Sequence, residues 1–193
     1  IERATQKDIA KEIIKYLDRI DPIAKKIGAV NTIVINDGKL TGYNTDVFGA
    51  ICAIREKIEI CGKNTVLLGA GGAAKAIGYG IIEKKGNLII SNRTTEKGKK
   101  LANELNAKFK SINEIEWNNI DILINATSVG MVPNTNESPL DYKYLKYLKN
   151  KVVFDSVYNP IITKLLNIAE KNKCKTISGI KMFVNQAAKQ FEL

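Results

Sequence analysis

No histidine occurs among the 193 residues of this chain. Histidine is the side chain that most readily exchanges protons near neutral pH and the commonest metal ligand. Its absence excludes histidine-based metal sites and Ser–His or Cys–His nucleophile pairs from this sequence. Any acid–base chemistry must therefore use lysine, aspartate, glutamate, tyrosine or cysteine side chains.

Cysteine is scarce and long apolar runs are missing. Cys52, Cys61 and Cys174 are odd in number and widely separated, which fits neither a disulfide framework nor a four-ligand zinc cluster. We expect reduced thiols, no metal site and a cytoplasmic protein. Runs such as Ile122-Leu123-Ile124 are far too short to cross a bilayer, so we expect no membrane association.

Positive charge is in excess, with 30 basic against 20 acidic residues and a formal net charge of +10. The lysines are dispersed, as in Lys25-Lys26, Lys84-Lys85 and Lys99-Lys100, without an aromatic-studded basic strand or a recognition helix. We expect no nucleic-acid partner and interpret the charge as solvated surface that also attracts an anionic ligand.

A glycine-rich turn follows an apolar strand in the sequence Val66-Leu-Leu-Gly-Ala-Gly-Gly-Ala-Ala74. In such a turn Gly69 permits a tight bend, Gly71 lets the backbone approach a diphosphate, and the small Ala74 lets the next helix pack close to the strand. The N–H groups at that helix N-terminus would face the phosphates. The pattern predicts a dinucleotide site.

The residues after the next strand favour NADP over NAD. Sites for NAD usually place Asp or Glu about 20 residues after the turn, to bind the ribose 2′-hydroxyl. This chain has Asn92 and Arg93 there, and an arginine offers a planar cationic fork to a 2′-phosphate. Lys97, one helical turn further on, can add a second charge.

From Thr65 onward predicted strands and helices alternate, which is typical of an α/β fold with a doubly wound parallel sheet. Strands are expected near 65–69, 87–91, 121–125, 151–155 and 174–178, and helices near 72–84, 95–105, 161–172 and 180–191. The stretch from Val132 to Tyr144 is predicted to be a loop, either beside the ligand crevice or as a plain surface connection.

The N-terminal segment predicts only part of a second α/β domain. Thr5 and Asp8 resemble a capping box before an amphipathic helix that would end at Asp21-Pro22. Segments 29–35 and 39–43 are predicted to be two strands joined by the turn Asn36-Asp37-Gly38. We expect three parts: a partial substrate-binding domain (1–45), a Rossmann-like NADP-binding domain opened by a connecting helix (46–179), and a C-terminal helix returning toward the first domain (180–193).

Seven sequence blocks, in order and spacing, resemble the NADP-dependent shikimate dehydrogenase family of the chorismate pathway. They are Ile27-Gly-Ala-Val-Asn-Thr32, Gly42-Tyr-Asn-Thr-Asp46, Gly69-Ala-Gly-Gly-Ala-Ala74, Asn92-Arg-Thr94, Asn125-Ala-Thr-Ser-Val-Gly-Met131, Asp155-Ser-Val-Tyr-Asn-Pro160 and Gly179-Ile-Lys-Met-Phe-Val-Asn-Gln-Ala-Ala188. The resemblance implies reversible reduction of 3-dehydroshikimate to shikimate by NADPH, with an Asp–Lys pair, in a monomer or homodimer.

The resemblance also implies roles for individual residues. Asp46 would be the aspartate of the catalytic pair, and the substrate would be bound by Asn31, Asp46, Tyr158 and Gln186. The cofactor would be bound by Gly69, Gly71, Gly72, Ala73, Asn92, Arg93, Thr94, Lys97, Thr127, Ser128, Val157, Gly179 and Met182.

Two family features are missing from this sequence. The Ser-x-Ser motif for the substrate carboxylate and the Asn-Val-Thr-x-Pro-x-Lys motif that supplies the catalytic lysine do not occur. Aligning Lys15-Tyr16-Leu17-Asp18 with the family puts Ala10 at the lysine position, and Lys11 fills it only after a one-residue shift. The sequence also stops at Phe191-Glu192-Leu193, where members of the family continue into a further helix, so we expect a chain truncated at both ends.

Plainer explanations exist for several candidate residues. Asp46 could be a helix N-cap, a role compatible with catalysis. Asn31 could be a polar strand residue, Gln186 a solvent-facing helix residue and Arg93 an ordinary surface cation. The residues also leave three other functions open: an NADP-binding module without catalysis, a quinate or broad-specificity paralogue that uses NAD, and a basic nucleic-acid-binding protein.

Overall fold

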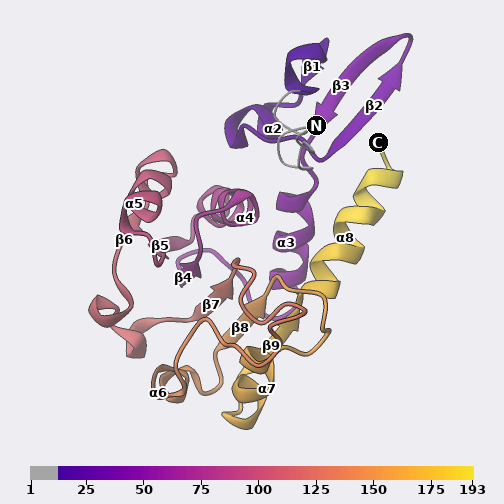
Figure 1. The fold of residues 1–193 in the computed structure, drawn as a ribbon. Coiled ribbons are helices and arrows are strands. Elements are labelled where there is room, and N and C mark those ends of the chain that lie inside the picture. The colour runs from indigo at the N-terminus through magenta and orange to yellow at the C-terminus, as the bar shows by residue number, and fades with distance from the viewer. Residues whose placement is uncertain (1–12) are drawn as a thin grey trace.

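The computed structural model describes residues 13–193 and contains two separate sheets (Figure 1). The smaller sheet has the order β1-β3-β2, with β1 parallel and β2 antiparallel to β3. Its strands are β1 (Arg19–Ile20), β2 (Thr32–Asn36) and β3 (Lys39–Tyr43). Asp37 and Gly38 both have positive φ, 50° and 74°, as the two central residues of a type I′ hairpin turn require. The predicted hairpin is confirmed.

The predicted N-terminal helix is wrong over the described residues. The structure has a short 3₁₀ helix, η1 (Ile13–Tyr16), and then strand β1 where the helix was expected to continue. Pairing with β3 overrides the helical spacing, because Ile20 lies beside Gly42 in the sheet. Asp21 caps a new helix, α2 (Pro22–Ile27), so Pro22 begins a helix instead of ending one. The expected capping box, Thr5 and Asp8, lies outside the described residues.

The larger sheet has the order β6-β5-β4-β7-β8-β9 and every pair in it is parallel. Its strands are β4 (Asn64–Leu68), β5 (Asn87–Ser91), β6 (Lys108–Phe109), β7 (Ile122–Asn125), β8 (Val152–Asp155) and β9 (Lys175–Ser178). In chain order this is 3-2-1-4-5-6, the doubly wound arrangement. The predicted α/β fold class is confirmed, and the strand order reverses between β4 and β7, where such sheets bind ligands.

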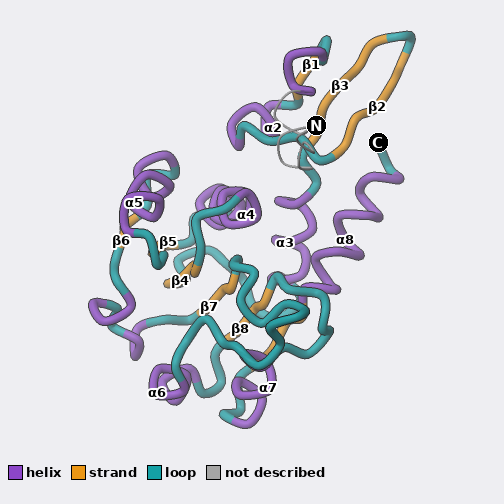
Figure 2. The backbone as a smooth tube through the Cα atoms, viewed as in Figure 1, coloured by secondary structure: helices purple, strands orange, loops and turns teal. Residues whose placement is uncertain are grey.

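Helices cover both faces of this sheet (Figures 1 and 2). They are α3 (Asp46–Arg55), α4 (Gly72–Glu83), α5 (Thr95–Glu104), α6 (Tyr142–Leu145), α7 (Lys164–Lys171) and α8 (Gly179–Phe191). Successive side chains of a strand point to opposite faces of the sheet and so belong to two different hydrophobic cores. Leu67 belongs to the core under α3, α4 and α5, whereas Val66 and Leu68 belong to the core under α6 and α7. Burial on both faces explains why the central strands β7 and β8 are apolar at every residue but the last.

Short elements between β5 and β8 do not follow from the sequence pattern. The structure adds β6, the 3₁₀ helices η2 (Ile112–Glu114), η3 (Trp117–Asn119) and η4 (Lys146–Leu148), and α6. Helix α6 begins inside the stretch expected to be a loop, where Asp141 accepts a hydrogen bond from the Lys143 N–H at 2.9 Å. The connection from β7 to α6 is otherwise irregular (Figure 2).

Helices α3 and α8 lie side by side between the two sheets (Figure 1). A Cβ added to Gly49 of α3 would lie 2.6 Å from the Met182 carbonyl oxygen and 3.0 Å from the Gln186 Cβ. At the other end of the pair, the Gln190 side-chain amide donates to the Thr45 hydroxyl at 3.4 Å. The absence of a side chain at Gly49 thus sets how closely the two helices pack. The domain boundaries expected from the sequence stay a prediction.

Replacing Gly49 by alanine should destabilise the protein by about 1–3 kcal/mol, because the new methyl group overlaps backbone atoms of α8 that cannot swing away. Urea denaturation of the ligand-free protein measures the effect. Gly72→Ala is the matched control, since a Cβ there meets nothing within 4 Å. Equal stability of the two variants would contradict the close packing of α3 on α8.

Candidate cofactor site and active site

The turn after β4 brings three strand ends together. Gly69 has φ 119°, and its N–H donates to the Ser91 carbonyl at the end of β5 at 2.9 Å. A Cβ on Gly69 would lie 2.8 Å from the Ala126 carbonyl oxygen, just after β7. Glycine is therefore required here both for its backbone conformation and for the close approach of the neighbouring loop.

The N-terminus of α4 is open and uncapped. Gly71 occupies the N-cap position and no side chain accepts a hydrogen bond there. A Cβ on Gly71 or Gly72 would meet no atom within 4 Å, whereas Ala74 behind them is fully buried against the sheet. The first N–H groups of α4, including those of Gly72 and Ala73, are thus available to an anion, which fits the phosphates of a dinucleotide.

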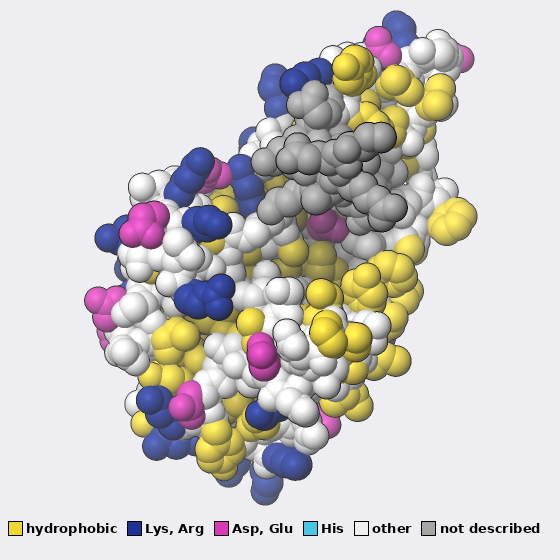
Figure 3. Space-filling model, viewed as in Figure 1, with side chains coloured by type: hydrophobic (Ala, Val, Ile, Leu, Met, Phe, Trp, Pro, Cys, Tyr) yellow, Lys and Arg dark blue, Asp and Glu magenta, His cyan; other side chains and the backbone are white. Residues whose placement is uncertain are grey.

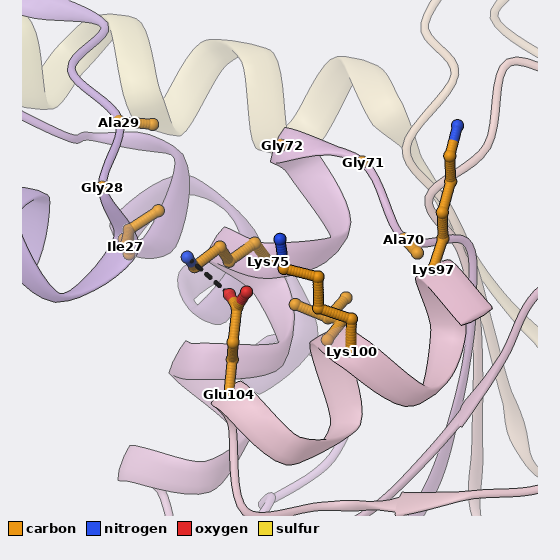
Figure 4. A pocket seen from close by; sticks show the side chains of 11 residues that line it. Ile27, Gly28, Ala29, Ala70, Gly71, Gly72, Lys75, Lys97, Lys100 and Glu104 are labelled. Atoms are coloured by element: carbon orange, nitrogen blue, oxygen red, sulfur yellow. Dashed lines mark ion pairs between the residues drawn. The ribbon is translucent and has the colours of Figure 1, made fainter. Parts of the chain in front are cut away.

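A cavity of about 390 Å³ lies beside this turn (Figure 4). It is lined by Ile27, Gly28, Ala29, Ala70, Gly71, Gly72, Lys75, Lys97, Lys100, Leu101 and Glu104. The structure thus brings the predicted cofactor residue Lys97 to the same cavity as Gly71 and Gly72. It also places there three charged residues that the sequence reasoning missed, namely Lys75, Lys100 and Glu104.

The other predicted 2′-phosphate residues lie at the β5–α5 junction. The Asn92 side-chain amide donates to the Thr94 carbonyl at 2.8 Å, which fixes the bend into α5. Arg93 and Thr94 are exposed and do not line the cavity that Lys97 lines. Arg93 therefore lies on the surface at the start of α5, outside the lining of this cavity.

A buried polar network joins the loops after β7 and β8. The Asp155 carboxylate accepts hydrogen bonds from the Asn125 amide at 2.8 Å, the Val157 N–H at 3.1 Å and the Thr163 hydroxyl at 2.6 Å. Asn125 in turn accepts from the Thr127 hydroxyl at 2.7 Å. The predicted cofactor residues Thr127 and Val157 are held in place by this network.

Asp155 is completely buried, and burial raises the pKa of its carboxyl group. The three hydrogen bonds from neutral donors oppose that shift but do not cancel it. Sequence reasoning missed Asn125 and Asp155 as organising residues. The signal was present, because each is the polar last residue of an apolar parallel strand and so lies at the ligand-binding edge.

Helix α8 begins in close contact with the loop after β8. A Cβ on Gly179 would overlap the carbonyl oxygens of Ser156 and Val157, so only glycine permits this approach. Met182, one turn along α8, is buried. Tyr158 stacks on Phe183 of α8 with ring centroids 5.2 Å apart, and both rings remain exposed.

Asp46 stands at the start of α3 on the side of the smaller sheet. Its carboxylate accepts a hydrogen bond from the Asn31 amide at 2.9 Å, so the structure brings these two predicted substrate residues together. The Asn31 side-chain oxygen accepts from the Thr45 N–H at 3.0 Å, which fixes the orientation of the amide. Asp46 is not the helix cap: it is the first helical residue, and the Asn44 side-chain oxygen accepts its N–H at 3.1 Å.

Burial raises the pKa of Asp46, and the hydrogen bond from Asn31 only partly opposes the shift. Asn44 and Thr45, which organise this corner, were missed as functional residues although they lie in the block that contains Asp46. Gln186 is half-buried on α8. Its Cβ faces Gly49, which lies one turn after Asp46 in α3. Ser128 is exposed on the loop after β7.

Residues 53–177, more than half of the chain, match the sequence profile described as Shikimate / quinate 5-dehydrogenase. The chain belongs to this family. The fold described above agrees with that of a solved member of the family. Membership also explains why the seven sequence blocks occur in this order.

Individual shikimate / quinate 5-dehydrogenases are similar to this chain over nearly its whole length. A shikimate dehydrogenase (NADP(+)) of Methanocaldococcus jannaschii is 46% identical over 192 residues, covering 94% of this chain and 67% of the relative. A crystal structure of a shikimate dehydrogenase in complex with NADP+ has 43% identity and a TM-score of 0.87, covering 95% of this chain and 67% of that one. The Thermus thermophilus enzyme with NADP(H) and shikimate has 30% identity and the same TM-score, 0.87, covering 95% and 69%.

The chain thus spans about two thirds of the length of these relatives. A bifunctional 3-dehydroquinate dehydratase/shikimate dehydrogenase of Arabidopsis thaliana is 43% identical, and the chain covers 33% of it.

Within residues 13–193, none of the helices combines the length and apolar character needed to cross a membrane.

The raised pKa of Asp46 predicts how Asp46→Asn changes stability with pH. Between the ordinary carboxyl pKa and the raised folded-state value, the folded protein binds more protons than the unfolded chain, so this group's contribution to stability falls as pH rises. Asparagine keeps an acceptor for Asn31 but removes the charge from this half-buried position. The variant should gain stability relative to the wild type from about pH 4 upward and then level off.

Urea denaturation at a series of pH values measures this difference. Asp37→Asn, on the β2–β3 turn, is the control for removing one negative charge from an exposed position. If the stability of Asp46→Asn relative to the wild type falls as the pH rises, the folded protein favours the charged form of Asp46 over the protonated form, and the prediction is wrong.

Proposed function

We propose that this protein is an NADP(H)-dependent shikimate dehydrogenase that interconverts 3-dehydroshikimate and shikimate. The observation that carries the proposal is the uncapped glycine turn at the strand-order reversal, which opens into a lysine-lined cavity. The names of the similar proteins support the cofactor and the substrate. The hydrogen bond from Asn31 to Asp46 supports a polar substrate site on the adjoining lobe.

On the cofactor side, the proposed roles are those that the family resemblance implies, and the cavity lined by Gly71, Gly72 and Lys97 supports them. The N–H groups of Gly71, Gly72 and Ala73 would bind the diphosphate, and Gly69 would shape the turn. The 2′-phosphate would be bound by Asn92, Arg93, Thr94 and Lys97, and the nicotinamide half by Thr127, Ser128, Val157, Gly179 and Met182. When bound, NADPH supplies the hydride.

On the substrate side, Asn31, Asp46, Tyr158 and Gln186 would bind ring hydroxyls and exclude water. Asp46 uses one carboxylate oxygen for Asn31, and no described residue donates a hydrogen bond to the other oxygen. That oxygen can orient a substrate hydroxyl or the ammonium group that gives its proton to the developing alkoxide. The family's lysine would be that donor, and Lys11, the residue that fits after a one-residue shift, lies outside the described residues.

We also propose a cytoplasmic protein that is a monomer or a homodimer. The three cysteines are free, as is usual in a reducing compartment.

Shikimate oxidation by the purified protein tests the proposal. We expect NADPH to form from NADP+ and shikimate, and Asp46→Asn to lower kcat about a hundredfold or more while NADP+ binding is retained. Quinate and NAD+ are the comparison substrates, and faster turnover with that pair would favour a quinate dehydrogenase. Tight NADP+ binding without turnover of either substrate would identify a binding module instead.

Arg93→Ala should weaken NADPH binding about tenfold or more and leave NADH binding nearly unchanged, because only NADPH carries the 2′-phosphate. Titration of both cofactors against the protein measures the difference. Arg55→Ala, which removes an arginine paired with Glu59 at the end of α3, is the control. Equal losses of affinity for both cofactors would overturn the 2′-phosphate role of Arg93.

A further inference from the structure

An ion pair lies in the wall of the cofactor cavity. Lys75, in the first turn of α4, lies with its Nζ 2.7 Å from the carboxylate of Glu104, the last residue of α5. The two side chains are 28% and 37% exposed, so solvent screens them only in part. In Figure 4 the pair joins the two helices just below Gly28.

Three charged residues of α5 line this cavity at helical spacing. Lys97, Lys100 and Glu104 are separated by three and then four residues and therefore share one face of the helix. Lys100 lies between Lys97 and the ion pair along α5 (Figure 4). The cavity wall thus carries three ammonium groups and one carboxylate, together with the uncapped N-terminus of α4.

An unpaired carboxylate at Glu104 would oppose the binding of phosphate in this cavity. Lys75 neutralises it, and Glu104 in turn holds the Lys75 ammonium group against α5 and away from the glycine turn. The balance of charge facing the turn therefore depends on both partners, and removing either one changes it by a full unit in opposite directions.

We propose that the Lys75–Glu104 pair sets how tightly the phosphates of NADP(H) are held, with Lys100 as a further cation of the same wall. Lys75 and Glu104 would act on the cofactor through their charges, from the wall of the cavity beside the glycine turn. This inference rests on the proposed NADP(H) site.

Calorimetric titration with NADP+ separates a charge effect from a structural one. Glu104→Gln should tighten NADP+ binding about threefold, and Lys75→Met should weaken it about threefold, as expected for one charge acting across a solvated cavity. The double variant restores the charge balance and should bind nearly as the wild type does. The differences of the two single variants from the wild type should shrink when the salt concentration is raised.

A second Lys–Glu pair offers a matched control. Lys181 and Glu56 join α8 to the end of α3 at 3.2 Å and lie outside the cavity. Lys181→Met and Glu56→Gln should leave NADP+ binding unchanged.

Two results would overturn the inference while leaving the proposed function intact. One is a loss of affinity in both Glu104→Gln and Lys75→Met; the other is a double variant that binds less tightly than either single one. Both would mean that the pair only joins α4 to α5. A wild-type protein that binds no NADP+ would overturn the proposed function itself.

Discussion

The candidate cofactor site depends on one close contact between two backbone segments. The turn after β4 lies directly against the loop after β7. Because Gly69 carries no side chain, the turn after β4 can lie against the Ala126 carbonyl and still bond to the end of β5. This contact aims the first turn of α4 at the point where strand order reverses. Any side chain at Gly69 would push the loop after β7 away and separate the two halves of the cofactor site.

Three further contacts link this turn to the start of α3. The Asp155–Asn125 hydrogen bond ties the loops after β7 and β8 together, and the groups that donate to Asp155 are all neutral. Gly179 then lets α8 start directly on the second loop, and Gly49 lets α8 pack tightly along α3. The position of Asp46 at the head of α3 is therefore fixed from the large sheet through one side-chain hydrogen bond and two close contacts of α8.

The sequence predicts five of the six strands of the large sheet, because strands such as β7 and β8 are apolar up to their last residue and the helices between them have periodic apolar faces. It does not predict β6, a two-residue strand. It also predicts the hairpin, whose turn residues require positive φ. It does not predict β1, since a two-residue strand exists only through its partner β3. The Lys75–Glu104 pair was invisible for a similar reason: its members are 29 positions apart and meet only when α4 and α5 pack.

Charge is distributed unevenly between the two ends of the site, and this has a chemical consequence. Basic side chains gather with interspersed acidic ones over the α5 side of the molecule, as Figure 3 shows, where phosphates would bind. Among the described residues, the hydrogen-bonding neighbours of Asp46 are the neutral side chains of Asn31 and Asn44, and Thr45 bonds to Asn31 in turn. Burial raises the pKa of this carboxyl group, and the single neutral donor only partly opposes the shift. A lysine ammonium group placed against the second carboxylate oxygen would be held more strongly than in water, because the carboxylate is poorly solvated there, and it would lower that pKa again.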